Sequence, residues 1–333
     1  MEKIIKNNIN ITNINKNEKL EFTILIYCID YNSLDITLNS IKYQINITYE
    51  IIIINDNNDI IHLNDIKKYK DINVNIKIIN NKKRKGLMFS YSLGALNSKG
   101  NYILMLQSGH TLSYKNVLYS LYSISFNNNI DFLEFNLLLN NQNNINGNSS
   151  TLIEIFNLNY NIDFKSMKNN INSKEINEEV IFNKIIKSES YKNIIIKYNL
   201  TKYNEIIYKY YGNILKILFN KNKLKYYYVN IFGVVENINN IGYIKMKNII
   251  KNKNQTITDA IFYIDFLFNI SDPQVFEKKI VLKEFINLMS IIFNRFTKLT
   301  YKSIKLYKKF LKCKFFSNED KNELQFFFKS LLN

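Results

Sequence analysis

Proline, glycine, cysteine and tryptophan are scarce in this chain, whose 333 residues include one proline, eight glycines, two cysteines and no tryptophan. Two cysteines, Cys28 and Cys313, cannot build a disulfide framework, so a disulfide-rich secreted domain is excluded and a reducing compartment is indicated. Cys28 lies in an apolar run and is predicted to be a small core residue. Asparagine, isoleucine, lysine, tyrosine and phenylalanine are abundant instead, which indicates drift under an A/T-rich genome.

Arginine is rare in this chain. Of its 45 lysines and arginines, only Arg84 and Arg295 are arginines. The formal net charge of +17 would by itself suggest a nucleic acid or an anionic membrane as partner. However, a surface that reads phosphates or guanines generally uses the forked guanidinium group, which lysine lacks. Nucleic acid is therefore not an expected partner.

Long hydrophobic runs are also missing. No segment reaches the roughly 18 apolar residues that a membrane-spanning helix needs. Residues 1–17 are rich in asparagine and lysine and lack the apolar stretch of a secretory signal. The sequence therefore predicts a cytoplasmic protein without a transmembrane segment.

Strands alternate with helices in the first half of the chain. Four short apolar runs are each typical of a strand that is buried on both faces. Ser33 is a candidate N-cap for a helix in which Leu34, Leu38 and Ile41 share one face. This alternation predicts an α/β fold with a doubly wound, mostly parallel sheet. The four runs are Phe22–Cys28, Glu50–Ile54, Asn73–Ile79 and Tyr102–Leu106.

Further elements are predicted beyond the fourth run. Tyr114–Phe126 has the pattern of a helix and Ile130–Leu139 that of a strand. Residues 180–198 and 203–219 are predicted to be helices, and Tyr226–Val235 a strand.

The chain is predicted to fall into three parts. Residues 1–20 form a polar tail, residues 21–235 an α/β domain, and residues 236–333 a helical region. Capping boxes such as Thr256-x-x-Asp259 indicate helix starts in the third part. Its many phenylalanines are more than a few isolated helices can bury, so we expect these helices to pack on the α/β domain.

Four ordered motifs resemble the family-2 glycosyltransferases of the GT-A fold, over residues 21 to about 235. Tyr27–Asp30 follows the opening strand at the place of the family's Pro-x-Tyr-Asn. Asn55-Asp56-Asn57-Asn58 ends a strand in the manner of the family's Asp-Asp-Gly-Ser. The four motifs are Glu21–Ile26, Leu38-Asn39-Ser40-Ile41-x-x-Gln44, Tyr49–Asn58, and Gly86–Gly94 with Ser98-Lys99-Gly100-x-Tyr102-Ile103.

The resemblance implies a site for the donor nucleotide made by Asp56, Asp30, Tyr27 and Lys85. Asp56 matches the acid that contacts the nucleobase in the family, whereas the acid before it is replaced by Asn55. From the residues alone, Asp56 is equally well explained as an aspartate that caps the turn after a strand.

A basic run precedes Gly86, where the next helix is predicted to begin. It comprises Lys82, Lys83, Arg84 and Lys85. Cations beside a helix N-terminus favour an anion such as a diphosphate, and such lysines could partly replace a metal ion. The alternative is an ordinary solvated basic loop.

The family's metal motif, Asp-x-Asp, aligns with Gln107, Ser108 and Gly109, followed by His110. Mg²⁺ and Mn²⁺, the metals usual in the family, favour carboxylate ligands. Gln107 is neutral, Gly109 has no side chain, and a lone His110 is more often structural than a ligand. No metal cofactor is therefore expected.

The family's catalytic base is an acid that lies one helix before a tyrosine-rich strand, here Tyr226–Tyr228. Counting back by one helix reaches Gly212 and Asn213, which are not acids. Glu205 is the nearest carboxylate and the only candidate base, and it is otherwise a solvated residue on a helix.

The resemblance implies a hexosyltransferase-type enzyme that transfers a sugar from a nucleotide-sugar donor to a glycan or a glycosylated acceptor. The altered metal motif argues against ordinary metal-dependent catalysis. Two alternatives stay open: a pseudoenzyme that binds a nucleotide, a glycan or a protein without catalysis, and a basic scaffold whose helical region binds a partner.

Overall fold

The computed structural model describes residues 5–11, 20–57, 59–62, 65, 69, 75–140, 182–202 and 211–237, with isolated residues beyond 237. The chain divides into two compact units, one of residues 1–206 and 218–249 and the other of residues 207–217 and 250–333. Nearly all described residues belong to the first unit. The helices predicted beyond residue 255, and their packing, lie outside the described residues.

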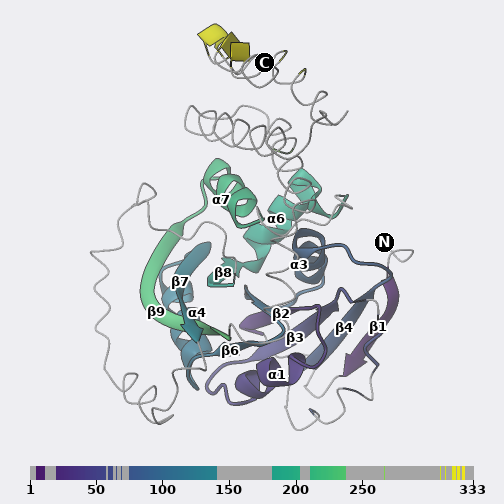
Figure 1. Ribbon diagram of the computed structural model, residues 1–333. Helices are drawn as coiled ribbons and strands as arrows, with labels where there is room; N and C mark the ends of the chain where they lie inside the picture. The colour runs from purple at the N-terminus through teal and green to yellow at the C-terminus, as the bar shows by residue number, and fades with distance from the viewer. Residues whose placement is uncertain are drawn as a thin grey trace. The chain divides into compact units, whose positions relative to one another are not determined.

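Nine strands of the described part form one sheet, in the order β1-β4-β3-β2-β5-β8-β7-β9-β6 (Figure 1). The strands are β1 (Ile5–Ile11), β2 (Phe22–Cys28), β3 (Tyr49–Asn55), β4 (Asn75–Asn81), β5 (Tyr102–Gln107), β6 (His110–Leu112), β7 (Phe132–Asn140), β8 (Lys184–Lys187) and β9 (Tyr226–Asn237). The helices are α1 (Leu34–Lys42), α3 (Leu87–Leu96), α4 (Val117–Asn127), α6 (Ser188–Tyr198) and α7 (Tyr211–Lys221), with a short 3-10 helix, η5 (Leu200–Lys202).

The centre of the sheet is parallel, which confirms the predicted fold class. Strands β4, β3, β2 and β5 are neighbours that all run in the same direction, and they are the four apolar runs seen in the sequence. Strands β3 and β4 follow β2 on one side, whereas β5 lies on its other side. The strand order therefore reverses between β2 and β5. In open α/β sheets, ligands bind beyond the carboxyl ends of the strands at such a reversal of strand order.

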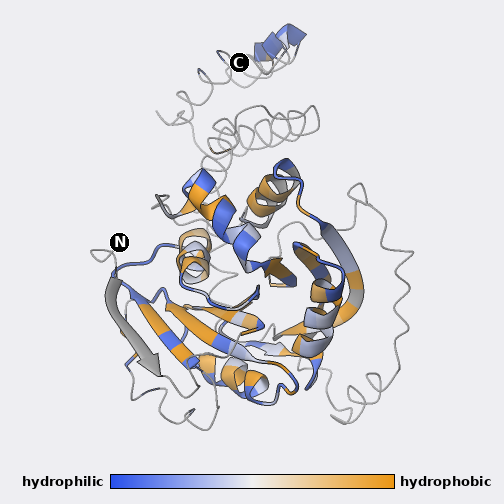
Figure 2. Cartoon of the chain, turned by 180° about the vertical axis from the view of Figure 1, so that it is seen from behind, coloured by the Kyte–Doolittle hydropathy of each residue, from blue (hydrophilic) through white to orange (hydrophobic). Residues whose placement is uncertain are grey.

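Both faces of the central strands are buried. These strands are coloured largely hydrophobic in Figure 2. One face packs against the apolar side of α1, where Leu34, Leu38 and Ile41 are fully buried as predicted, and against α4. The other face carries α3, which contacts β2 and β3. The helix α3 is buried nearly all round, because α6 and η5 cover its outer side.

Two predicted segments differ from the structure. Residues 180–198, expected to be one helix, form β8 followed by α6, and β8 runs antiparallel between β5 and β7. Residues 5–11, placed by the sequence in a polar tail, form β1 and pair antiparallel with β4. In both cases a neighbouring strand supplies hydrogen-bonding partners that the local sequence does not reveal, and tertiary context decides the conformation.

Glycine is required at the start of α3. Gly86 is the N-cap residue and has φ 84° and ψ 175°, a backbone conformation that residues other than glycine rarely adopt. The helix begins at Leu87, one residue after the start predicted at Gly86. The basic run 82–85 lies between the carboxyl end of β4 and this turn.

Candidate functional site

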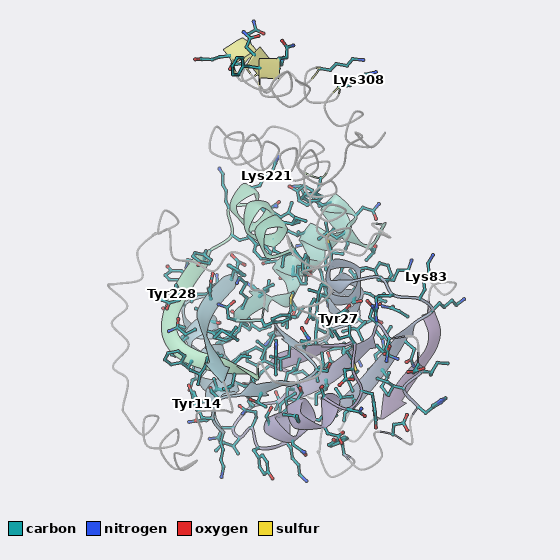
Figure 3. The ribbon with its side chains drawn as sticks, in the orientation of Figure 1. Tyr27, Lys83, Tyr114, Lys221, Tyr228 and Lys308 are labelled. Atoms are coloured by element: carbon teal, nitrogen blue, oxygen red, sulfur yellow. The ribbon has the colours of Figure 1, made fainter. Side chains whose placement is uncertain are left out.

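At the carboxyl ends of β2, β3 and β5, Tyr27, Asp56 and Gln107 lie on one face of the sheet. Tyr27 pairs with Ile54 of β3 on one side and with Gln107 of β5 on the other. Asp56 lies two residues beyond Ile54 and therefore returns to the same face. Tyr27 is labelled near the centre of the sheet in Figure 3.

Asp56 is the hydrogen-bonding centre of this edge. Its Oδ1 accepts from the side-chain amide of Asn81 at 2.8 Å and from the backbone N–H of Lys85 at 2.7 Å. Its Oδ2 accepts from the Tyr27 hydroxyl and from the backbone N–H of Gly86, both at 2.8 Å. A carboxylate offers about four lone-pair sites, so protein donors occupy the capacity of Asp56.

Asp56 is fully buried. Burial raises the pKa of its carboxyl, and the four hydrogen bonds act in the opposite direction. The carboxylate thus ties the ends of β2, β3 and β4 to the start of α3. Contact between Asp56 and a nucleobase stays a prediction, and in this conformation it would require one of the four donors to move.

Asp30 is also buried and lies just after β2. Its Oδ2 accepts from the backbone N–H of Ser33 at 3.0 Å and from the Ser33 hydroxyl. Ser33 is the N-cap residue of α1, as predicted, although its side chain makes no hydrogen bond of the usual capping kind. Asp30 therefore helps to hold the first turn of α1, and its proposed contact with a nucleotide stays a prediction.

The loop after β5 is held by backbone and α1 contacts. The Gly109 N–H donates to Thr37 Oγ1 at 2.8 Å, and the Ser108 N–H donates to the Tyr27 carbonyl at 2.9 Å. The Gln107 N–H donates to His110 Nδ1 at 3.3 Å, so this nitrogen acts as an acceptor. Gly109 has φ 100°, a conformation that favours glycine over any residue with a side chain.

The donor set of this loop does not fit a hard divalent cation. Gln107, Ser108 and His110 are buried and bring no carboxylate, and His110 Nδ1 already accepts a hydrogen bond. Of the two described acids at this edge, Asp56 is saturated by protein donors and Asp30 accepts from Ser33. Among the described residues, no three His, Cys, Asp or Glu side chains come together in a group that could hold a metal ion.

The basic run lies next to Asp56. Lys82 and Lys83 are exposed, whereas Lys85 is 6% exposed and its ammonium lies 5.3 Å from the centre of the Phe89 ring. Burial lowers the pKa of Lys85, and repulsion from Lys83 acts in the same direction, while Asp56 opposes both. A positive charge that is already poorly solvated is favourably placed to receive an anion.

The predicted catalytic base is not placed by the structure, because Glu205 lies outside the described residues. Gly212 is buried near the start of α7. Sequence reasoning did not select Glu134 of β7, which is buried opposite Lys184 of β8. Its only local signal was a carboxylate inside a predicted apolar strand.

The model of the family described as "Glycosyl transferase family 2" matches residues 23–194, just over half of the chain. The chain belongs to this family. The match begins in β2 and ends in α6, so it includes the parallel strands and the loop after β5. This confirms the resemblance seen in the sequence and establishes a glycosyltransferase-like domain.

Solved structures of similar fold include TarS of S. aureus. A TarS fragment (1–349) in complex with UDP has a TM-score of 0.54 and 12% identity, over 89% of this chain and 81% of that one. The same fragment in complex with UDP-GlcNAc has a TM-score of 0.53 and 13% identity, over 88% and 81% of the two chains. At this identity the likeness concerns the fold alone. No curated protein sequence matches the chain.

The part of the chain that the structure describes contains no helix long and apolar enough to cross a membrane.

Proposed function

We propose that this family-2 domain binds a nucleotide sugar at the carboxyl edge of β2, β3 and β5, without a metal ion held by the protein. The neutral loop Gln107–His110 carries this proposal, because it stands where the resemblance implies metal-binding carboxylates. Membership of the family and the strand reversal between β2 and β5 support a nucleotide site at this edge. UDP and UDP-GlcNAc, which TarS binds in its crystal structures, are the first donors to test.

Lysine side chains take the role of offsetting the diphosphate charge in this proposal. Lys85 contributes from a buried position beside the α3 N-terminus, where a helix favours negative charge. The exposed Lys82 and Lys83 add an electrostatic attraction that salt screens over about 8–10 Å. A divalent ion brought by the diphosphate would find no described cluster of acids to hold it and would be repelled by these lysines.

In the favoured form of the proposal the domain transfers the sugar to an acceptor. The second form is a binding protein without catalysis, and one observation favours it: the described acids at this edge, Asp56 and Asp30, both accept hydrogen bonds from the protein. Release of UDP from UDP-GlcNAc in the presence of an acceptor panel separates the two forms.

Calorimetry of UDP binding tests the metal-free site. We expect the affinity in EDTA to be unchanged within about twofold when Mn²⁺ is added in excess. The double variant Lys82→Ala/Lys83→Ala should bind several-fold more weakly at low salt and converge on the wild type at high salt. The matched control is Lys42→Ala/Lys115→Ala, which removes two exposed lysines from α1 and from the loop before α4.

A tenfold or greater gain in UDP affinity on adding Mn²⁺ would overturn the metal-free proposal. Equal losses in the two double variants would show a non-specific effect of net charge instead. Absence of binding to UDP and to a panel of other nucleoside diphosphates would overturn the nucleotide site as a whole.

A further inference from the structure

A buried ion pair lies on the second half of the sheet. Lys184 of β8 is 3.6 Å from the Glu134 carboxylate of β7, and both side chains are 5% exposed. A buried ion pair contributes little net stability, because desolvation of the two charges offsets their attraction. A pair of hydrophobic residues would pack at least as well here, which points to a role for these charges beyond packing.

Polar groups continue around this pair. The Tyr226 hydroxyl donates to Glu134 Oε2 at 2.8 Å, and the Lys184 ammonium donates to the Asn183 side-chain oxygen at 2.7 Å. The Tyr226 ring stacks on Phe132 of β7, with 5.1 Å between ring centres. Burial raises the pKa of Tyr226, and Glu134 adds to this shift, so the hydroxyl stays a donor.

The cluster reaches the surface at Tyr228. The register of β7 and β9 places Tyr228 opposite Glu134, and its hydroxyl donates to the Asn136 side chain two residues further along β7. Tyr228 is 42% exposed, and Figure 3 shows it on the flank of β9. Together, Glu134, Asn136, Tyr226 and Tyr228 form what we call the β7–β9 face.

The β7–β9 face lies on the same face of the sheet as Gln107, at the carboxyl edge where we propose the nucleotide site. Ile185 pairs with Leu104, so one step further in this antiparallel register Lys184 falls opposite Met105 of β5. Met105 and Gln107 share a face, because they are two residues apart in a strand. With strands about 4.8 Å apart, Glu134 lies roughly 10 Å from β5 across β8.

We propose that the β7–β9 face binds a glycan, with Tyr228 and Asn136 in contact with the sugar and Glu134 and Lys184 as positioning residues. An aromatic ring offers an apolar surface for the C–H face of a pyranose, and an amide can both donate to and accept from sugar hydroxyls. The buried pair fixes this arrangement through Tyr226 and the β7–β9 register. The glycan's assignment as the acceptor, rather than glycan binding itself, rests on the proposed function.

Glycan binding is tested with the full chain on a printed panel of oligosaccharides built from hexoses and N-acetylhexosamines. The strongest binder is then titrated against variants by calorimetry. Tyr228→Ala and Asn136→Ala should each weaken binding at least tenfold, whereas Tyr228→Phe, which keeps the ring, should stay within about threefold of the wild type. The matched control is Tyr43→Ala, which removes an exposed tyrosine at the end of α1.

UDP binding is measured on the same variants. We expect Tyr228→Ala to bind UDP as the wild type does, which also shows that the variant is folded. No binding to the panel at millimolar glycan, or an equal loss in Tyr43→Ala, would overturn the glycan site. If the wild type binds the glycan but does not bind UDP, the proposed donor site alone would be overturned.

Discussion

The Tyr27 hydroxyl donates a 2.8 Å hydrogen bond to Asp56, joining the end of β2 to the residue that follows β3. Three further donors, from Asn81, Lys85 and Gly86, converge on the same carboxylate. A single buried side chain therefore holds the ends of β2, β3 and β4 and the start of α3 in place.

Asp56→Asn should destabilise the fold strongly. The amide can accept on one side only, so about two buried donors lose their acceptor, and each such loss costs roughly 1–3 kcal/mol. We expect a decrease of about 3 kcal/mol in the free energy of unfolding, measured by urea denaturation. Asp59→Asn, at an exposed position four residues after Asn55, is the control and should change stability by less than about 0.5 kcal/mol. Equal stability of the two variants would contradict the structural role of Asp56.

UDP affinity should depend on pH through Lys85. Burial lowers the pKa of this lysine, so its charge is lost at a lower pH than that of an ordinary lysine. Affinity should therefore fall as the pH rises, at a lower pH than an ordinary lysine would give, and Lys85→Met should bind weakly and lose this part of the decline. Lys115→Ala should retain the wild-type decline. A flat profile in the wild type would show that Lys85 does not contact the diphosphate.

Gly109→Asp restores one acid of the family's metal motif but should not restore a metal site. The backbone at Gly109 has φ 100°, so any side chain there introduces strain of about 1–3 kcal/mol. We expect the melting temperature to fall and to be insensitive to Mn²⁺. The melting temperature of Gly109→Ala should fall by a similar amount. A rise in melting temperature with Mn²⁺ in Gly109→Asp alone would show that the loop can still ligate metal.

Lys184→Met should be more damaging than the double variant Lys184→Met/Glu134→Gln. The single change leaves the Glu134 charge buried without its cation, which costs about 3–5 kcal/mol, whereas the double change removes both charges. Urea denaturation of the wild type, the single variants Lys184→Met and Glu134→Gln, and the double variant gives the coupling energy. Additive effects of the two substitutions would contradict the buried ion pair.

The central strands could be predicted because each is a short apolar run closed by polar residues. The segments of β2 and β3 are buried on both faces, and such runs have few alternatives to a central parallel strand. The start of α3 was equally local, because Gly86 stands at a turn that only glycine accommodates readily. In contrast, Lys184–Lys187 is too short and too mixed in character to be recognised as a strand, and it becomes β8 because β5 and β7 lie on either side of it.

The sequence by itself determined the parallel centre of the sheet, the family resemblance and the absence of carboxylates from Gln107–His110, since all three depend on residues close together in the chain. Only the tertiary structure decided that Asp56 is saturated by four donors and that Glu134 faces Lys184 and Tyr228. These relationships depend on strand register, and a shift of one residue would turn each side chain to the opposite face. Periodicity in the sequence reports which face of an element is buried, but it does not report which distant element lies beside it.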